Sequence, residues 1–161
     1  MTSPSEVLRE AFAYHAWATT TLIDALERLD AGALDSGIEG TYGPIAETLT
    51  HLVDADDRYL QRLVAVDVPP YVDHGAQPLG ALRARVVEHG PRWTAMLERL
   101  DAGTLAARVD RGEDGTIDPA ETLLLLQALH HGNDHRTQVC SALGALGLDV
   151  PDLDVWTFFG A

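Results

Sequence analysis

The sequence of 161 residues predicts an all-α protein folded as a four-helix bundle. Half of its eight prolines stand where a helix would begin, and proline is favoured at the first helical position because its missing N–H needs no partner there. Apolar residues follow each of these prolines at intervals of three and four, which is typical of amphipathic helices. The length suits one domain with one core, so we expect residues 1–161 to form a single unit.

The first helix is expected over residues 4–29. Ser3 and Glu6 flank its initial proline with the spacing of a capping box, in which two side chains bond to otherwise free N–H groups. The second helix is expected from Pro44, with an apolar stripe over residues 45–63, and it must end before Pro69-Pro70 because consecutive prolines cannot continue a helix.

The third helix, over residues 79–100, has the most regular stripe but contains Gly90-Pro91 in its middle. Proline there removes one backbone hydrogen bond, so we expect a kink, or two helices in register, around residues 88–91. The fourth helix is expected from Pro119 to about Leu146, because Gly147 is the kind of residue that closes a helix.

Two connections are long. Residues 67–77 contain Pro69, Pro70 and Gly75 and are expected to form an irregular loop, whereas residues 105–117 could form a small β-hairpin between helices three and four. Trp156, Phe158 and Phe159 make the C-terminal tail too apolar to remain in water. We expect the tail to fold onto the bundle or to enter a subunit contact.

The composition is strongly acidic, with 25 Asp and Glu against 11 basic residues, all arginine, and a net charge of −14. Such a chain repels phosphate groups, which argues against nucleic acid or a membrane surface as a partner. The N-terminus lacks the pattern of a signal peptide, and the longest apolar run, Leu123–Leu126, is far too short to span a bilayer. A cytoplasmic location is therefore expected.

The principal functional signal is a set of three histidines. His131 and His135 stand four residues apart on a mostly small or apolar face of the fourth helix, so both rings are expected to point inward and can reach one ion. His51, on the second helix, would supply a third ligand and leave an open position, as in catalytic metal sites. Alternatively, the pair consists of core histidines with hydrogen-bond partners, and His51 is an ordinary boundary residue.

Other residues are candidates for supporting roles. Asp54 and Gln138 lie one turn beyond a predicted ligand and could accept the second N–H of its ring, although ordinary surface roles are equally compatible with their positions. The candidates for pocket or core residues on the inner stripes are His15, His89 and Tyr59.

His130 is expected to face water beside the metal site. Cys140 is the lone cysteine, so it can form no internal disulfide. It is turned about 140° from His135 around the helix and is not expected to be a ligand.

Four segments together resemble the DinB/YfiT-like metalloenzymes: Tyr14–Trp17, Glu47–Ala55, His131–Gln138 and Leu148–Asp154. The resemblance implies an up-down-down-up bundle, a divalent metal such as zinc or nickel held by three histidines, and often a homodimer. Carried onto this sequence, the ligands are His51, His131 and His135. The chain departs from the family pattern at His15, where asparagine is common, and at Gly90-Pro91. The first departure leaves open a fourth ligand or a pocket residue.

Family members with assigned activities use low-molecular-weight thiols, as in thiol S-transferases and the mycothiol-dependent maleylpyruvate isomerases. The leading hypothesis is accordingly a metal-dependent, thiol-dependent S-transferase or isomerase acting on a small-molecule substrate, in which the ion lowers the pKa of the bound thiol. A metal-dependent hydrolase is the alternative enzyme. A non-catalytic, metal-binding, stress-associated dimer is the alternative from outside the enzymes.

Overall fold

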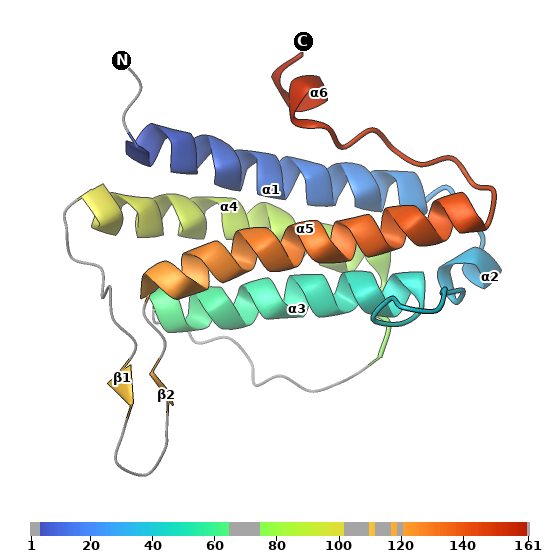
Figure 1. Ribbon diagram of the computed structural model, residues 1–161, viewed down its shortest axis with the longest axis horizontal. Coiled ribbons are helices and arrows are strands. Elements are labelled where there is room, and N and C mark those ends of the chain that lie inside the picture. The colour runs from blue at the N-terminus through green and yellow to red at the C-terminus, as the bar shows by residue number, and fades with distance from the viewer. Residues whose placement is uncertain (1–3, 65–74, 102–109, 112–116, 119–120, 161) are drawn as a thin grey trace.

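The computed structural model describes residues 4–64, 75–101, 110–111, 117–118 and 121–160. Four long helices form the bundle: α1 (Pro4–Leu26), α3 (Ile45–Val64), α4 (Leu79–Asp101) and α5 (Glu121–Ala145). Helices α1 and α3 lie diagonally opposite, and each packs against both α4 and α5. The directions along the chain are up, down, down and up (Figure 1), which confirms the predicted fold class.

The helix ends follow the prolines and glycines as predicted. The first bonds of α3 and α4 run from Thr48 N–H to the Pro44 carbonyl (2.8 Å) and from Leu82 N–H to the Pro78 carbonyl (3.1 Å). At the end of α5, Gly147 takes a φ of +71°, and the next N–H, of Leu148, donates to the Leu143 carbonyl at 3.0 Å. A residue with a Cβ rarely adopts this conformation, so glycine ends the helix there.

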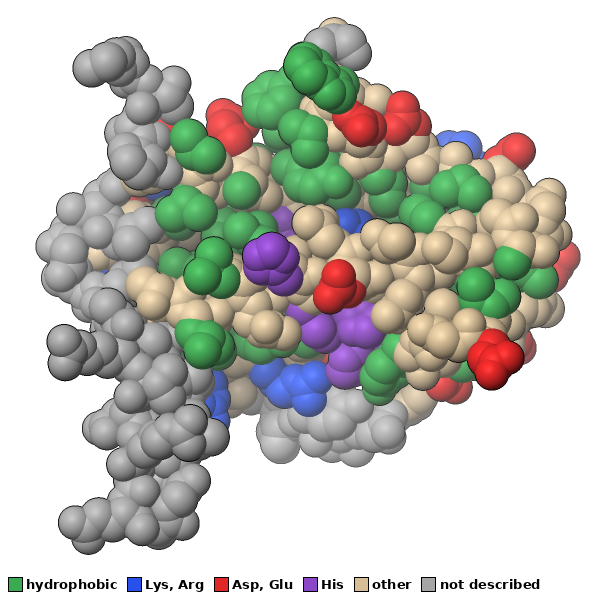
Figure 2. All heavy atoms as spheres, viewed as in Figure 1, with side chains coloured by type: hydrophobic (Ala, Val, Ile, Leu, Met, Phe, Trp, Pro, Cys, Tyr) green, Lys and Arg blue, Asp and Glu red, His purple; other side chains and the backbone are tan. Residues whose placement is uncertain are grey.

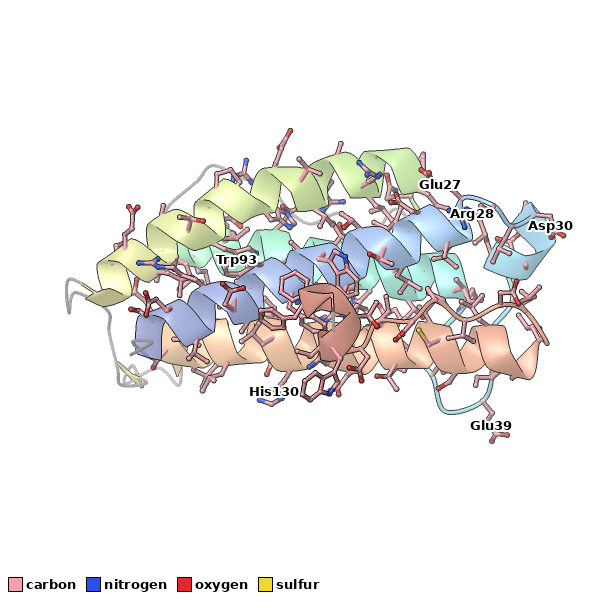
Figure 3. The ribbon with its side chains drawn as sticks, turned by 90° about the horizontal axis from the view of Figure 1, so that it is seen from above. Glu27, Arg28, Asp30, Glu39, Trp93 and His130 are labelled. Carbon is pink, nitrogen blue, oxygen red and sulfur yellow. The ribbon has the colours of Figure 1, made fainter. Side chains whose placement is uncertain are left out.

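Helix α4 continues through Pro91, so the alternative of two helices in register is wrong. The missing N–H of Pro91 would have bonded to the carbonyl of Val87, one turn earlier. Both residues are exposed, and water can therefore satisfy that carbonyl. The inner face of the same turn packs normally; Trp93 points from α4 toward α1 (Figure 3), where its ring lies 4.6 Å from that of Phe12.

Two short helices accompany the bundle. Helix α2 (Ala31–Leu34) was not predicted; Asp30 caps it by accepting a hydrogen bond from Ala33 N–H at 2.9 Å. Helix α6 (Val155–Phe159) contains the apolar tail and lies against α1 (Figure 1). The ring of Phe158 contacts Tyr14 and Trp17, at centroid distances of 5.9 and 5.4 Å. The tail therefore folds onto the bundle, as predicted.

Strands β1 (Asp110–Arg111) and β2 (Ile117–Asp118) pair antiparallel between α4 and α5. Residues 112–116, which would form the turn of the predicted hairpin, lie outside the described residues, as do most of loop 67–77 and the predicted helix start at Pro119. No helix in the described part of the chain has the length and apolarity needed to cross a membrane.

The buried interior is divided into two apolar clusters by a polar layer. One cluster fills the end of the bundle that holds the start of α3 and the end of α5, and the other fills the opposite end. Between them, at mid-bundle, lie buried polar side chains from all four helices: His15, Thr19, Asp56, Asp57, His89, His135 and Arg136. Burying polar groups is costly unless they are bonded or serve a function, so this layer is where a site is expected.

Candidate metal centre

The three predicted histidines meet at the edge of the polar layer. Helix α3 supplies His51, and one face of α5 supplies His131 and His135 four residues apart. The Nε2 atom of His131 lies 3.1 Å from His51 Nε2 and 3.1 Å from His135 Nε2. No other group of three or more histidine, cysteine or acidic side chains in the described ranges gathers its ligand atoms in this way. The predicted convergence of α3 and α5 on a common point is confirmed.

The spacing of these nitrogens suits a divalent ion. Zinc–nitrogen bonds are about 2.1 Å, so two nitrogens on a tetrahedral ion lie roughly 3.4 Å apart, close to the separations found here. His135 is buried, whereas His51 and His131 are partly exposed. Figure 2 shows histidine side chains reaching the molecular surface at the middle of the bundle. Among the described residues, a bound ion would therefore have protein on one side and access for a small molecule on the other.

Gln138 sets the tautomer of His135. Its Oε1 atom accepts the backbone N–H of Tyr42 at 3.0 Å, and since a backbone N–H can only donate, this atom must be the amide oxygen. The same oxygen lies 3.0 Å from His135 Nδ1, so that nitrogen carries the proton. Nε2 of His135 is then left with a free lone pair directed at the other two rings, as a metal ligand requires.

Electrostatics also favour neutral imidazoles. Burial, reinforced by the neighbouring His135 and His51, lowers the pKa of His131 to about 4. Arg58 acts in the same direction and Asp56 opposes it. At neutral pH the ring of His131 is therefore uncharged, which is the form that binds metals.

Two tyrosines line the cluster. Tyr59, a predicted pocket residue, places its ring edge-on to His131 at a centroid distance of 6.0 Å. Tyr42, which was not predicted, stacks on His51 at 4.0 Å and lies edge-on to His135 at 5.5 Å. It is an aromatic residue in a loop, between Gly40 and Gly43 and just ahead of the helix that carries His51, and this position is the sequence signal that could have identified it.

In the described part of the chain, Asp54 makes no hydrogen bond to any of the three histidines. Its carboxylate accepts from Arg85 on α4 at 2.5 Å, and the same guanidinium binds Asp57. These contacts hold α3 and α4 together at mid-bundle. A role for Asp54 in orienting His51 therefore has no support in these contacts, whereas the equivalent role of Gln138 toward His135 does.

The other two inner histidines are each paired with a carboxylate. His15 Nε2 lies 2.7 Å from Asp56 Oδ2, and His89 Nε2 lies 2.6 Å from Asp57 Oδ1. His15 also approaches Arg136 through Nδ1, at 3.2 Å. With both ring nitrogens engaged, His15 is not positioned as a fourth ligand. It packs so closely on α5 that a Cβ on Gly132 would lie 2.3 Å from its Cε1 atom.

His130 and Cys140 both lie away from the cluster, as expected. His130 is exposed and points from α5 into solvent (Figure 3). Cys140 lies on the side of α5 that faces Tyr14 of α1. Among the described residues, one face of α5 thus carries His131 and His135, and Cys140 lies on another face.

The fold and the site agree with the comparison to known families. The model of the DinB superfamily matches residues 14–139, which is most of the chain and includes all three histidines. No curated protein matches the sequence. By this family match, which covers most of its length, the chain belongs to the DinB superfamily.

Proposed function

We propose that the protein is a metal-dependent enzyme that uses a low-molecular-weight thiol to modify a small electrophilic substrate, as an S-transferase or isomerase. The observation that carries the proposal is the convergence of three Nε2 atoms at the edge of the bundle, with two of the three rings partly exposed. Three protein ligands with an accessible side are typical of catalytic rather than structural sites.

The proposed ligands are His51, His131 and His135, and the proposed ion is zinc or nickel. A divalent ion held there would lower the pKa of a coordinated thiol, so that a thiolate would be available at neutral pH. The protein's own part is to present neutral imidazoles, to fix the ring of His135 through Gln138, and to shield one side of the site with Tyr42 and Tyr59.

An external thiol is favoured over a protein nucleophile. The sole cysteine, Cys140, lies on the other side of α5, and burial raises the pKa of its thiol, which makes it a poor nucleophile. In the described residues no carboxylate joins the three histidines, and the Asp56 carboxylate is bound to His15. A hydrolase would need a general base beside the ion, so this alternative ranks lower.

The test is turnover of the chromogenic electrophile 1-chloro-2,4-dinitrobenzene by zinc- or nickel-loaded protein, with and without an added thiol such as cysteine, glutathione or mycothiol. The proposal expects turnover that requires both metal and thiol, disappears in His131→Ala, and survives in His130→Ala, a matched exposed neighbour. Equal rates without thiol would exclude the transferase. A large loss of folding on chelation, with no turnover, would instead support an ion that only braces the helices.

We further propose that the protein forms a homodimer. Trp156 and Phe159 of α6 remain largely exposed, at 73% and 60%, although Phe158 between them is packed against α1. Two large apolar side chains exposed on one short helix favour burial against a second copy of the protein. Sedimentation equilibrium of the wild type and of Trp156→Ser tests the proposal, which requires a dimer that is weakened by the substitution.

A further inference from the structure

The face of α5 opposite His131 and His135 carries a cavity of about 390 Å³ with both polar and apolar lining. It lies between α5, Tyr14 on α1, and Leu153 in the segment that leads into α6. The hydroxyl of Tyr14 donates to the Leu153 carbonyl at 2.8 Å, and the ring of Phe158 packs against Tyr14. These contacts fix the C-terminal segment as one wall of the cavity.

The cavity wall includes a buried cation, Arg136, which bonds to Thr19, Asn133 and His15. Arg136 is 3% exposed, and in the described part of the chain no carboxylate lies within ion-pair distance of its guanidinium. Its NH1 donates to Thr19 Oγ1 at 3.0 Å and its NH2 to Asn133 Oδ1 at 2.5 Å. Asp56 acts on Arg136 only at longer range. A buried charge without a counter-ion is costly, so an anion beside it would be strongly favoured.

The rest of the lining is also suited to an anion. None of the described residues that line the cavity is acidic, although the chain carries a net charge of −14. Because Asn133 Oδ1 accepts from Arg136, its NH2 group is directed elsewhere and can donate. The hydroxyls of Thr137 and Ser141, both exposed on α5, supply further donors. The ring of Tyr14 and the side chain of Leu153 offer an apolar surface on the opposite wall.

We infer that this cavity binds a small molecule that carries a carboxylate on an apolar body. The carboxylate faces Arg136 and the donors of α5, and the apolar body lies against Tyr14 and Leu153. Arginine matches a planar carboxylate better than any other side chain does. Since the cavity lies on a different face of α5 from His131 and His135, loss of the metal leaves this binding intact, and the inference does not rest on the proposed function.

Cys140 provides a direct readout, because it is the chain's sole cysteine and lines the cavity. The experiment measures how fast this thiol reacts with the uncharged reagent 4,4′-dithiodipyridine at pH 8. The reaction is run in the presence of benzoate, of its neutral analogue benzamide, and of inorganic phosphate. At a benzoate concentration four times its dissociation constant, mass action predicts a rate about fivefold lower. Benzamide and phosphate at the same concentration are expected to leave the rate within about 1.5-fold of its value without additive.

Two variants locate the effect. Arg136→Met, checked for folding by circular dichroism, removes the charge and is expected to abolish protection by benzoate. Ser141→Phe fills the mouth of the cavity from an exposed position and is expected to abolish it without touching the core. Ala145→Phe, which adds the same ring four residues further along α5 and outside the cavity lining, is expected to retain it.

Absence of protection in the wild type would overturn the inference. So would equal protection by benzamide, equal protection by phosphate, or protection that persists in Ser141→Phe. If Arg136→Met does not fold, Ser141→Phe and its control still decide the outcome.

Discussion

The polar layer of the bundle contains two kinds of histidine, and the difference between them separates structure from function. His15 and His89 each bind a carboxylate through Nε2 and are almost fully buried. In the three-histidine cluster the Nε2 atoms face one another, and no carboxylate of the described residues is among the ligand atoms gathered there. The first kind completes a hydrogen-bond network within the protein. The second kind leaves a site that a positive ion would complete.

The largest expected effect concerns metal affinity. His131→Ala removes one of three ligands and should weaken zinc or nickel binding more than about a hundredfold, whereas metal-free stability should stay within about 1 kcal/mol of the wild type. Isothermal titration and urea unfolding measure the two quantities. His130→Ala is the matched control and should bind about one ion per chain. Full affinity in His131→Ala would contradict the assignment of this cluster.

For the histidines that bind a carboxylate we expect the opposite, a change that lowers the stability of the protein. Asp56→Ala leaves the buried ring of His15 without its acceptor; the two side chains are 3% and 2% exposed. Removing one member of such a buried pair should cost about 3 kcal/mol of unfolding free energy, measured with urea. Asp54→Ala is the control with a smaller effect, of about 1 kcal/mol, because Arg85 keeps its contact with Asp57 and the pair is partly exposed. If Asp56→Ala is as stable as the wild type, the carboxylate-bound histidines do not have the structural role that distinguishes them from the three-histidine cluster.

A third variant tests how the cluster is oriented. Gln138→Ala removes the oxygen that holds the proton on Nδ1 of His135, so the tautomer with a free Nε2 would be less populated. Metal affinity should fall about tenfold, as titration calorimetry would measure. Thr137→Ala, at an exposed neighbouring position, should leave metal affinity unchanged. An equal loss in both variants would argue against the tautomer explanation.

The smallest effect is a pH dependence of the metal-free protein. The pKa of His131 is about 4 in the folded state and about 6.5 when unfolded, so between these values the unfolded chain binds more protons. The contribution of His131 to stability should therefore be fully present above pH 6.5 and be lost as the pH decreases toward 4. Allowing for solvent screening of this half-exposed ring, the loss is on the order of 1 kcal/mol.

Urea unfolding in the presence of a chelator at pH 7 and pH 5 measures this dependence. His131→Ala should lose this part of the slope, and His130→Ala should keep it. A slope that is the same in all three proteins would assign the dependence to other groups.

The sequence predicts the bundle well because its helix ends depend on local chemistry. Pro44, Pro78 and Gly147 act through their own backbone geometry, which needs no tertiary information. The histidine spacing on α5 is likewise local. The convergence of His51 with that pair is not local, and only the apolar stripes and the family resemblance together predict it.

What the sequence did not reveal depends on contacts between helices. Asp54 was a candidate acceptor for the second N–H of His51, with an ordinary surface role equally compatible with its position. Arg85 on α4 binds it, and a single-helix pattern contains no information about a partner on another helix. Tyr42 reaches the cluster from a loop without periodicity. The cavity at Arg136 depends on where the C-terminal segment folds back, which amphipathic spacing does not predict.

Gly132 has a further consequence for α5. The His15 ring occupies the space where its Cβ would be, and the same Cβ would lie 3.0 Å from the guanidinium of Arg136. One added carbon would therefore have to displace α1 from α5, at a cost of about 1–3 kcal/mol. That displacement would disturb His131 on one flank and the cavity beside Arg136 on the other. The absence of a side chain at Gly132 therefore sets the distance between α1 and α5 beside both the three-histidine cluster and the cavity. A substitution at this position would affect both.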